Sequence, residues 1–137
     1  SKEKLNQLLP SMAVVCKPEG YADITAAANI KHHCESLKIL LKDNNVSSII
    51  FITVIPTFLN QEKLAEAIAE TYKKSKSNKP IFSVIMAGEY VKKARSILEK
   101  NGIYTFRNPK RAARTVAHLT KYALFHQDTK QGEKYDE

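Results

Sequence analysis

Three loops of this 137-residue chain hold residue types that can contact anions at the edge of an α/β sheet. Each loop follows a predicted strand. The residues that stand out are Asp23 and Thr25 in the first loop, Pro56 and Thr57 in the second, and Gly88 in the third. Backbone N–H groups at the start of a helix favour a phosphate or a carboxylate. Because all three loops lead into or closely precede a predicted helix, they predict an anion-handling site if they meet at one sheet edge.

Each loop also has a purely structural interpretation. Thr25 is an ordinary helix N-cap residue, Pro56 ends a strand, and Gly88 supplies the backbone freedom of a tight turn. One such loop alone would indicate little, whereas three at the same edge favour a binding site. Both interpretations stay open at the level of the sequence.

Other patterns of catalytic or metal-binding residues are not found. The sequence contains no GxGxxG, GxxxxGK[ST] or GxSxG motif, so a stand-alone nucleotide-binding enzyme is not indicated. His32, His33 and Cys34 are consecutive and point in three directions on a helix, so they cannot share one tetrahedral metal ion. We expect them at surface or edge positions. We assign neither them nor His118 and His126 as a catalytic base or phosphate carrier.

The apolar pattern predicts an alternation of strands and helices that would carry the three loops. Strands are predicted at residues 12–16, 46–55, 81–86 and 103–106, with a helix at the start of the chain and after every strand. Asn60 and Asn108 are expected to cap helices, and Gly102 to end one. Right-handed connections between such units produce one parallel sheet covered on both faces. The expected fold is a three-layer α/β/α sandwich, mainly parallel and flavodoxin-like.

Residues 46–55 are the expected centre of that sheet. Their sequence, VSSIIFITVI, is β-branched and apolar on both alternations, which is typical of a parallel strand buried on both faces. Residues 1–126 are then expected to form one domain. The polar residues 127–137 are expected to be a tail or linker.

Positive charge is concentrated in the last third of the domain. The net charge is +8, and between Glu89 and Lys121 there are nine Lys and Arg residues but only two Glu. Such a patch can attract polyanions. However, the aromatic residues nearby are not arranged as a stacking platform, and no RNP-like motif is present. A solvated helix face, or a docking surface for an acidic partner, is therefore favoured over nucleic-acid binding.

The composition is that of an ordinary globular chain, with 43% apolar and 26% charged residues. No apolar run approaches the about 20 residues that cross a bilayer, so no membrane association is expected. The first ten residues lack the apolar core of a signal peptide. Cys16 and Cys34 form no CxxC pair and are expected to be buried free thiols. Together these features predict a cytoplasmic location.

Five segments, taken in order, resemble one known family. They are DITAAA, LKILLKDNNVSSIIFI, VIPT, KPIFSVIMAGEYVKKARSILEKNGI and FRNPKRAARTVAHLTKY. Their order and spacing from Asp23 to Tyr122 resemble the CoA-ligase domain of the NDP-forming acyl-CoA synthetases. This is the superfamily that includes succinyl-CoA synthetase and the ADP-forming acetate–CoA ligases. Gly20-Tyr21 stands where the family often has Asn-Pro, and Ala87-Gly88 where it often has two glycines.

The resemblance implies a supporting role in a phosphoryl relay. Enzymes of this family convert acyl-CoA and phosphate into acyl phosphate and CoA, and pass the phosphate through a histidine to ADP. The loops at Asp23, Thr25, Pro56, Thr57 and Gly88 would then border the acyl and phosphoryl site and stabilise its charge. No catalytic residue is assigned to this chain.

The resemblance also implies which ligands and partners belong to the parent enzyme. CoA, ADP/ATP and Mg would bind there, and none is expected to bind this domain alone. The implied partners are an acyl substrate and the CoA-binding, histidine-bearing and ATP-grasp domains, on the same or another chain. Without these domains the isolated chain is expected to be inactive. The alternative is a non-catalytic regulatory or partner-docking module of the same fold, whose function lies in the basic residues from Lys92 to Lys121.

Overall fold

The main sheet has three parallel strands. The structure is a computed structural model that describes residues 1–16, 19–54, 59–86 and 89–132, with the backbone alone for residues 89 and 128–132. In the described part the strand order is β3 (Ile49–Val54), β4 (Ile81–Met86), β5 (Tyr104–Phe106). Ile49 is paired with Ile81 and Val54 with Met86, so β3 and β4 start and end at the same levels. The predicted parallel pairing of these three strands is confirmed.

Five α-helices and one short 3₁₀ helix occur in the described part of the chain. They are α1 (Lys2–Leu8), α2 (Ile30–Leu41), α3 (Gln61–Ser75), η1 (Glu89–Val91), α4 (Lys92–Lys100) and α5 (Pro109–Gly132). The Asn60 side chain accepts a hydrogen bond from the Lys63 N–H at 2.9 Å, which caps α3 as predicted. Gly102 follows α4 with a φ of +77°, as expected of the glycine that ends a helix.

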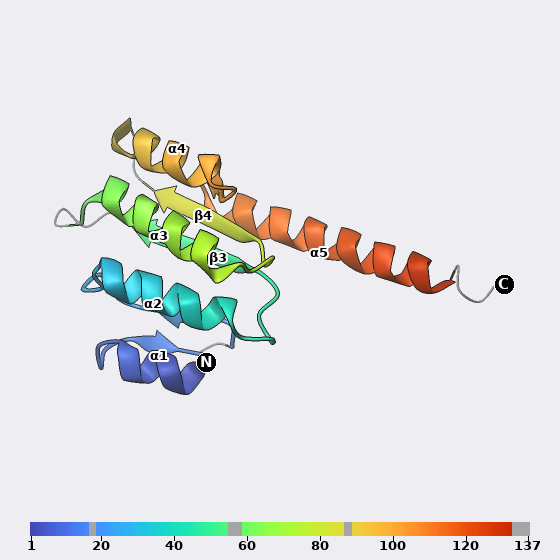
Figure 1. Ribbon diagram of the computed structural model, residues 1–137, viewed down its shortest axis with the longest axis horizontal. Coiled ribbons are helices and arrows are strands. Elements are labelled where there is room, and N and C mark those ends of the chain that lie inside the picture. The colour runs from blue at the N-terminus through green and yellow to red at the C-terminus, as the bar shows by residue number, and fades with distance from the viewer. Residues whose placement is uncertain (17–18, 55–58, 87–88, 133–137) are drawn as a thin grey trace.

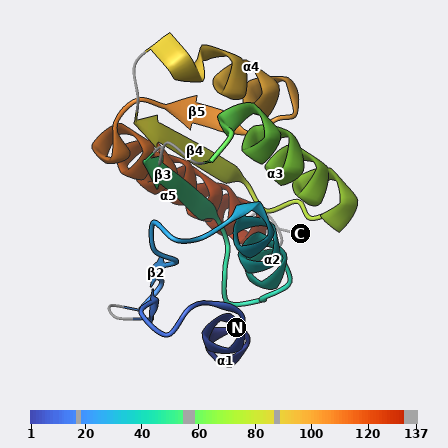
Figure 2. The same cartoon turned by 90° about the vertical axis from the view of Figure 1, so that its left-hand side faces the viewer.

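The helices lie on both faces of the sheet and make three layers. In Figure 1, α4, α3, α2 and α1 follow one another from top to bottom on one side, and α5 runs behind the sheet. Figure 2 shows α5 on the face opposite α3 and α4. Helix α5 contacts all three strands of the sheet, whereas α3 packs between α2 and α4. The predicted three-layer α/β/α architecture is confirmed.

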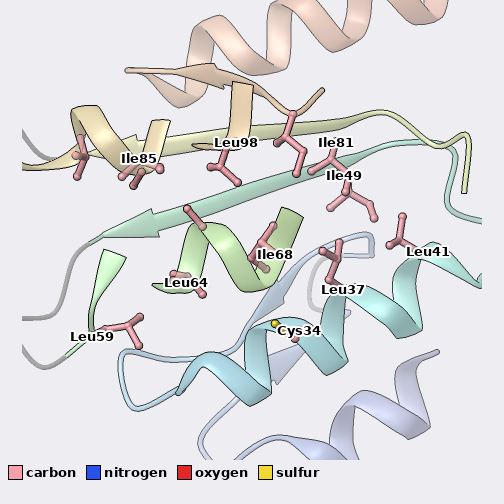
Figure 3. Close-up of a cluster of buried hydrophobic side chains, with 14 residues drawn as sticks. Cys34, Leu37, Leu41, Ile49, Leu59, Leu64, Ile68, Ile81, Ile85 and Leu98 are labelled. Atoms are coloured by element: carbon pink, nitrogen blue, oxygen red, sulfur yellow. The ribbon is translucent and has the colours of Figure 1, made fainter. Parts of the chain in front are cut away.

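The main hydrophobic core lies between the sheet and helices α2, α3 and α4 (Figure 3). Each element contributes residues at its own periodicity. Residues from α2 occur at i, i+3 and i+7, and the strands contribute alternate residues. The labelled members are Cys34, Leu37, Leu41, Ile49, Leu59, Leu64, Ile68, Ile81, Ile85 and Leu98. Cys34 is buried, which confirms the prediction of a buried thiol and contradicts the surface or edge position expected from its place beside His32 and His33. Cys16 is only partly buried, so the prediction of burial was wrong for it.

Residues 12–16 do not join the main sheet, so that prediction was wrong. β1 (Val14–Val15) instead pairs antiparallel with β2 (Ala22–Asp23), and the Cys16 N–H donates to the Tyr21 carbonyl at 2.7 Å. This local hairpin closes because Gly20, with a φ of +78°, permits a tight return of the chain. The hairpin packs with α1 in a small second core around Leu5, Leu9 and Val15.

β3 is an edge strand in the described part of the sheet, not the centre. Phe51 and Thr53 lie on the side of α3, and Thr53 is buried. On the other side Ile52 is 49% and Val54 65% exposed, so the prediction of burial on both faces was wrong. The reason is that β3 is paired only with β4, and α5, although it contacts β3, leaves Ile52 and Val54 near the end of the strand uncovered.

Helix α5 extends beyond the predicted end of the domain. Asn108 accepts a hydrogen bond from the Lys110 N–H at 2.8 Å and Pro109 is the first helical residue, as predicted. The helix then continues to Gly132, so the predicted tail at residues 127–137 begins inside it. No helix in the described part of the chain is both long and apolar enough to cross a membrane.

Candidate functional site

The loop that carries Asp23 and Thr25 is held by its own side chains. Asp23 Oδ1 accepts a hydrogen bond from the Thr25 N–H at 2.8 Å, and Thr25 Oγ1 accepts one from the Ala27 N–H at 3.3 Å. The Ala28 N–H donates to the Thr25 carbonyl at 3.3 Å. Thr25 has a φ of +69°, a conformation that is uncommon for a β-branched residue. These contacts bend the chain sharply between the hairpin and α2.

Helix α2 begins five residues after Thr25 and is capped by Asn29. The Asn29 side chain accepts from the His32 N–H at 3.0 Å, and His32 Nδ1 accepts from the Asn29 N–H at 3.3 Å. This is a capping box with histidine at the third helical position. The interpretation of Thr25 as an N-cap was therefore wrong, because Thr25 lies in the preceding turn.

A cleft of about 450 Å³ separates this loop from β3. One wall is formed by residues 20–26 with Ala28 and His33, and the other by Ile50, Ile52, Thr53 and Val54. The cleft thus brings Asp23 and Thr25 opposite the C-terminal end of β3, which is the edge where ligands bind in open α/β sheets. The residues that line the cleft carry apolar, hydroxyl and carboxylate groups.

Three of the predicted site residues lie outside the described residues: Pro56, Thr57 and Gly88. In the sequence, Pro56 and Thr57 come shortly after Val54, and Gly88 shortly after Met86. Since Val54 and Met86 are paired, β3 and β4 end at the same edge of the sheet. Of the five predicted site residues, the described part of the chain thus contains Asp23 and Thr25, and both line the cleft at the end of β3.

His33 also lines the cleft, and the prediction of a surface or edge position for it was wrong. Its side chain is only 8% exposed, and its ring packs edge-on against Phe51 with centroids 5.5 Å apart. Nδ1 is buried and has no hydrogen-bond partner among the described residues. Burial, and next the positive charge of His32, lower the pKa of His33 from 6.5 to about 4. The imidazole is therefore neutral at pH 7.

A signal for the burial of His33 is present in the sequence. His33 lies three residues after Ile30 and four before Leu37, and so belongs to the apolar stripe of α2. A histidine at such a position faces the sheet whatever its polarity. The consecutive His32, by contrast, turns toward the start of the helix and closes the capping box.

The electrostatics of the loop limit how it can assist an anion. The N–H groups of Thr25, Ala27, Ala28, Asn29 and His32 all donate within the segment itself. The N-terminus of α2 then contributes mainly through its dipole. No cluster of three or more His, Cys, Asp or Glu that could hold a metal ion occurs among the described residues.

These features define an α/β domain with a cleft at the carboxyl edge of a parallel sheet. No family model matches the chain. Its sequence is 37% identical over 123 residues to the α subunit of acetate–CoA ligase (ADP-forming) II of Pyrococcus furiosus, covering 88% of this chain and 26% of that subunit. It is 31% identical over 87 residues to the β subunit of succinate–CoA ligase (ADP-forming) of Persephonella marina, covering 64% of this chain and 22% of that subunit.

Solved structures share the fold of this chain. A protein from Pyrococcus horikoshii OT3 superposes with a TM-score of 0.71 at 37% identity, covering 78% of this chain and 24% of that one. The dinucleotide-forming acetyl-coenzyme A synthetase 1 of Ca. Korarchaeum cryptofilum shares the fold, with a TM-score of 0.79 at 23% identity over 88% of this chain and 26% of its own. The chain is homologous to a portion of the ADP-forming acetate–CoA and succinate–CoA ligases of the succinyl-CoA synthetase superfamily. It spans about a quarter of the length of these relatives.

Proposed function

We propose that this chain is the part of an NDP-forming acyl-CoA synthetase that helps to form the acyl and phosphoryl site. The observation that carries the proposal is the cleft between the Asp23–Thr25 loop and the end of β3, in a chain homologous to such ligases. The reaction of the parent enzyme would convert acyl-CoA, ADP and phosphate into acid, ATP and CoA through a phosphohistidine. The parent enzyme is proposed to be cytoplasmic.

The proposed contribution of this domain is electrostatic and steric. Asp23 and Thr25 would set the turn that borders the cleft, and the dipole of α2 would favour a negative charge near it. Thr57 and Gly88 carry backbone N–H groups that would act as donors. Pro56 has no N–H and would contribute only the direction of the chain. The apolar side chains of Ile50 and Ile52 would contact the acyl portion of the substrate.

The remaining chemistry would come from other domains. CoA, the nucleotide and Mg would bind to the CoA-binding and ATP-grasp domains of the parent enzyme, and its phosphoryl carrier would be a histidine on another segment. One of the homologous folds, the Korarchaeum synthetase, has been solved in complex with phosphate and ADP. The chain by itself is proposed to be inactive.

The test is made on the full-length polypeptide that contains this segment. ATP formation from acetyl-CoA, ADP and phosphate is measured for the wild type, Thr57→Pro and Thr57→Ala. Thr57→Pro removes a backbone donor and is expected to slow phosphoryl transfer, whereas Thr57→Ala keeps the N–H and is expected to retain turnover. Equal turnover of both variants, with unchanged circular dichroism, would contradict the assigned role. Absence of any ATP formation by the wild type would contradict the function itself.

A second candidate function is a non-catalytic docking module of the same fold. The exposed basic side chains of α4 and α5 favour it, including Lys92, Lys93, Arg111 and Arg114. Reversal of charge at Arg111 and Arg114 should then abolish association with a partner and leave catalysis untouched. A loss of turnover without a loss of association would count against this candidate.

A further inference from the structure

A second pocket, of about 290 Å³, lies between α4 and β5. Figure 2 shows β5 beside α4, and the two elements contact each other. The Thr105 hydroxyl of β5 donates a hydrogen bond to the Glu99 carboxylate of α4, which joins the two walls. This α4–β5 pocket shares no lining residue with the cleft at β3. Its polar lining residues are Lys92, Arg95, Ser96, Glu99, Thr105 and Arg107.

The pairing of the strands brings two arginines to the same pocket. Phe106 is paired with Val84, so Arg107 follows β5 at the level of Ile85. The Ile85 carbonyl accepts a hydrogen bond from Arg95 Nη2 at 2.7 Å. Helix α4 also begins at this edge of the sheet, because it follows β4, and its first residue lines the same pocket. The pocket therefore lies at the carboxyl edge, where ligands bind in open α/β sheets.

Arg95 is held in place by the strand but keeps unused hydrogen-bond donors. The side chain is half-buried, and its one hydrogen bond among the described residues is the one to the end of β4. Its Nε is buried and has no partner in that part of the chain. A guanidinium has five N–H donors, and a buried donor without a partner is costly. An anion that accepts hydrogen bonds from this guanidinium would offset that cost.

The charges that line the α4–β5 pocket match a doubly negative group. Lys92, Arg95 and Arg107 are positive, Glu99 is negative, and three charges against one leave a net charge of +2. A phosphate ester carries a charge of about −1.5 to −2 at pH 7. Arginine and lysine are the side chains that bind phosphate oxygens most often. The cleft at β3, by contrast, has no Lys or Arg among the residues that line it.

We propose that the α4–β5 pocket binds a phosphate group, with Lys92, Arg95 and Arg107 as its cationic contacts. Ser96 lies one turn after Lys92 on the same side of α4 and would add a hydroxyl donor. Inorganic phosphate and the phosphate ester of a larger ligand share this chemistry. The pocket lies outside the residues assigned above to the acyl and phosphoryl site, and its affinity for phosphate does not depend on the proposed reaction.

The experiment modifies the arginines of the full-length polypeptide with phenylglyoxal and measures each modified peptide by mass spectrometry. Inorganic phosphate is added at increasing concentration, while sodium chloride keeps the ionic strength constant. The modification of Arg107 should fall as phosphate fills the pocket. Arg114 on α5 is also exposed but lies outside the pocket, so its modification should stay unchanged. Equal modification of Arg107 with and without phosphate would overturn the proposal.

CoA and dephospho-CoA distinguish the two sources of the phosphate group. Protection of Arg107 by CoA but not by dephospho-CoA would identify a terminal phosphate ester as the ligand, and protection by inorganic phosphate alone would identify the free ion. Both outcomes support the site. Equal protection of Arg107 and Arg114 by every anion would reveal only general screening of charge and would overturn it. An Arg107 that resists modification before any phosphate is added would indicate that another segment covers the pocket, which would also overturn it.

Lys92 and Lys100 provide a matched pair of variants. Both are exposed lysines on α4, but only Lys92 lines the pocket. Lys92→Gln should raise the phosphate concentration that half-protects Arg107 about tenfold, because it removes a cationic contact. Lys100→Gln removes the same charge elsewhere and should change that concentration less than about twofold. Glu99→Gln removes the opposing carboxylate and should lower it. Equal effects of the two lysine variants would contradict the site.

ATP formation by the same preparations separates the phosphate site from the proposed function. A polypeptide that makes ATP but shows no protection of Arg107 would overturn the phosphate site and leave the proposed function standing. A polypeptide whose Arg107 is protected but that makes no ATP would overturn the proposed function and leave the phosphate site.

Discussion

The imidazole of His33 on α2 packs edge-on against the ring of Phe51 on β3, with ring centroids 5.5 Å apart. The contact joins α2, which contributes His33 to one wall of the cleft, to β3, which forms the other wall. It also places a titratable group in the interior, where its Nδ1 has no hydrogen-bond partner among the described residues. Since the charged form of a buried histidine is disfavoured, the contact couples the packing of α2 to pH.

Stability should therefore fall as the pH decreases from about 6.5 to 4. The pKa of His33 is lowered in the folded chain to about 4, so between these values the unfolded chain binds the proton more tightly. The contribution of neutral His33 to the folding stability is complete above pH 6.5 and is lost as the pH approaches 4. It should amount to no more than about 3 kcal/mol of unfolding free energy. Urea denaturation followed by circular dichroism at several pH values measures it.

His33→Phe tests whether this residue is the source of that pH dependence. The substitution keeps an aromatic ring against Phe51 and removes the buried Nδ1, so the slope between pH 6.5 and 4 should become shallower. His118→Gln, at an exposed position on α5, serves as the control and should leave the slope as in the wild type. If the unfolding free energy of His33→Phe still falls between pH 6.5 and 4 as steeply as that of the wild type, another group is responsible.

Two substitutions at Thr25 should change the unfolding free energy in opposite directions. Its φ of +69° is unfavourable for a β-branched residue, while its hydroxyl accepts a hydrogen bond from the Ala27 N–H. Thr25→Asn tolerates the conformation and can keep an acceptor, so the unfolding free energy should rise by about 0.5–1 kcal/mol. Thr25→Val keeps the branching and loses the acceptor, and should lower it by about 1 kcal/mol. Changes of the same sign in both variants would contradict this account of the turn.

Lys79 should stabilise the end of α2 from a distance of about forty residues in the sequence. Its Nζ donates to the Leu41 carbonyl at 2.8 Å, and also to the carbonyls of Leu40 and Asp43. These are terminal carbonyls of the helix, where a positive charge is favourable. Lys79→Met should cost about 1–2 kcal/mol in chemical denaturation. Lys63→Met, an exposed lysine in the first turn of α3, should cost less than about 0.5 kcal/mol; similar losses for both would refute the cap.

Lys76 ends α3 in a left-handed conformation that suits glycine better. Its φ is +52°, and its N–H donates to the Lys73 carbonyl. Lys76→Gly should raise the unfolding free energy by up to about 1 kcal/mol. Lys73→Gly, inside the last turn of the same helix, should lower it by about 1 kcal/mol. Thermal denaturation of the two variants gives the signs directly, and a destabilised Lys76→Gly would disprove the prediction.

Local signals predicted most of the secondary structure. The strand at residues 81–86 matches β4 residue for residue, because its limits are marked by Pro80 and by a change of composition. Asn60, Gly102 and Pro109 mark the ends of three helices correctly, since each acts through its own backbone or through groups within a few residues. The alternation of strands and helices then left a parallel α/β sheet as the expected fold.

The candidate site could be predicted only in part. Asp23 and Thr25 were selected by their type and their place before a helix, and they do line a cleft at the end of β3. The position of His33 in the cleft could not be predicted from its residue type, because its burial follows from its place in the apolar stripe of α2. The expected roles of Pro56, Thr57 and Gly88 remain predictions, since these residues lie outside the described part of the chain.

The sequence was sufficient for whatever depends on neighbours within one or two turns: helix ends, strand limits, apolar stripes and the family resemblance. The tertiary structure was needed for whatever depends on residues far apart in the chain. A run such as IIFITV is compatible with a central or an edge strand, and its neighbours in the sheet determine which side chains stay exposed. In the same way, Val14 and Val15 could have paired in parallel with a distant strand, but the closure of a short hairpin costs less entropy and prevails.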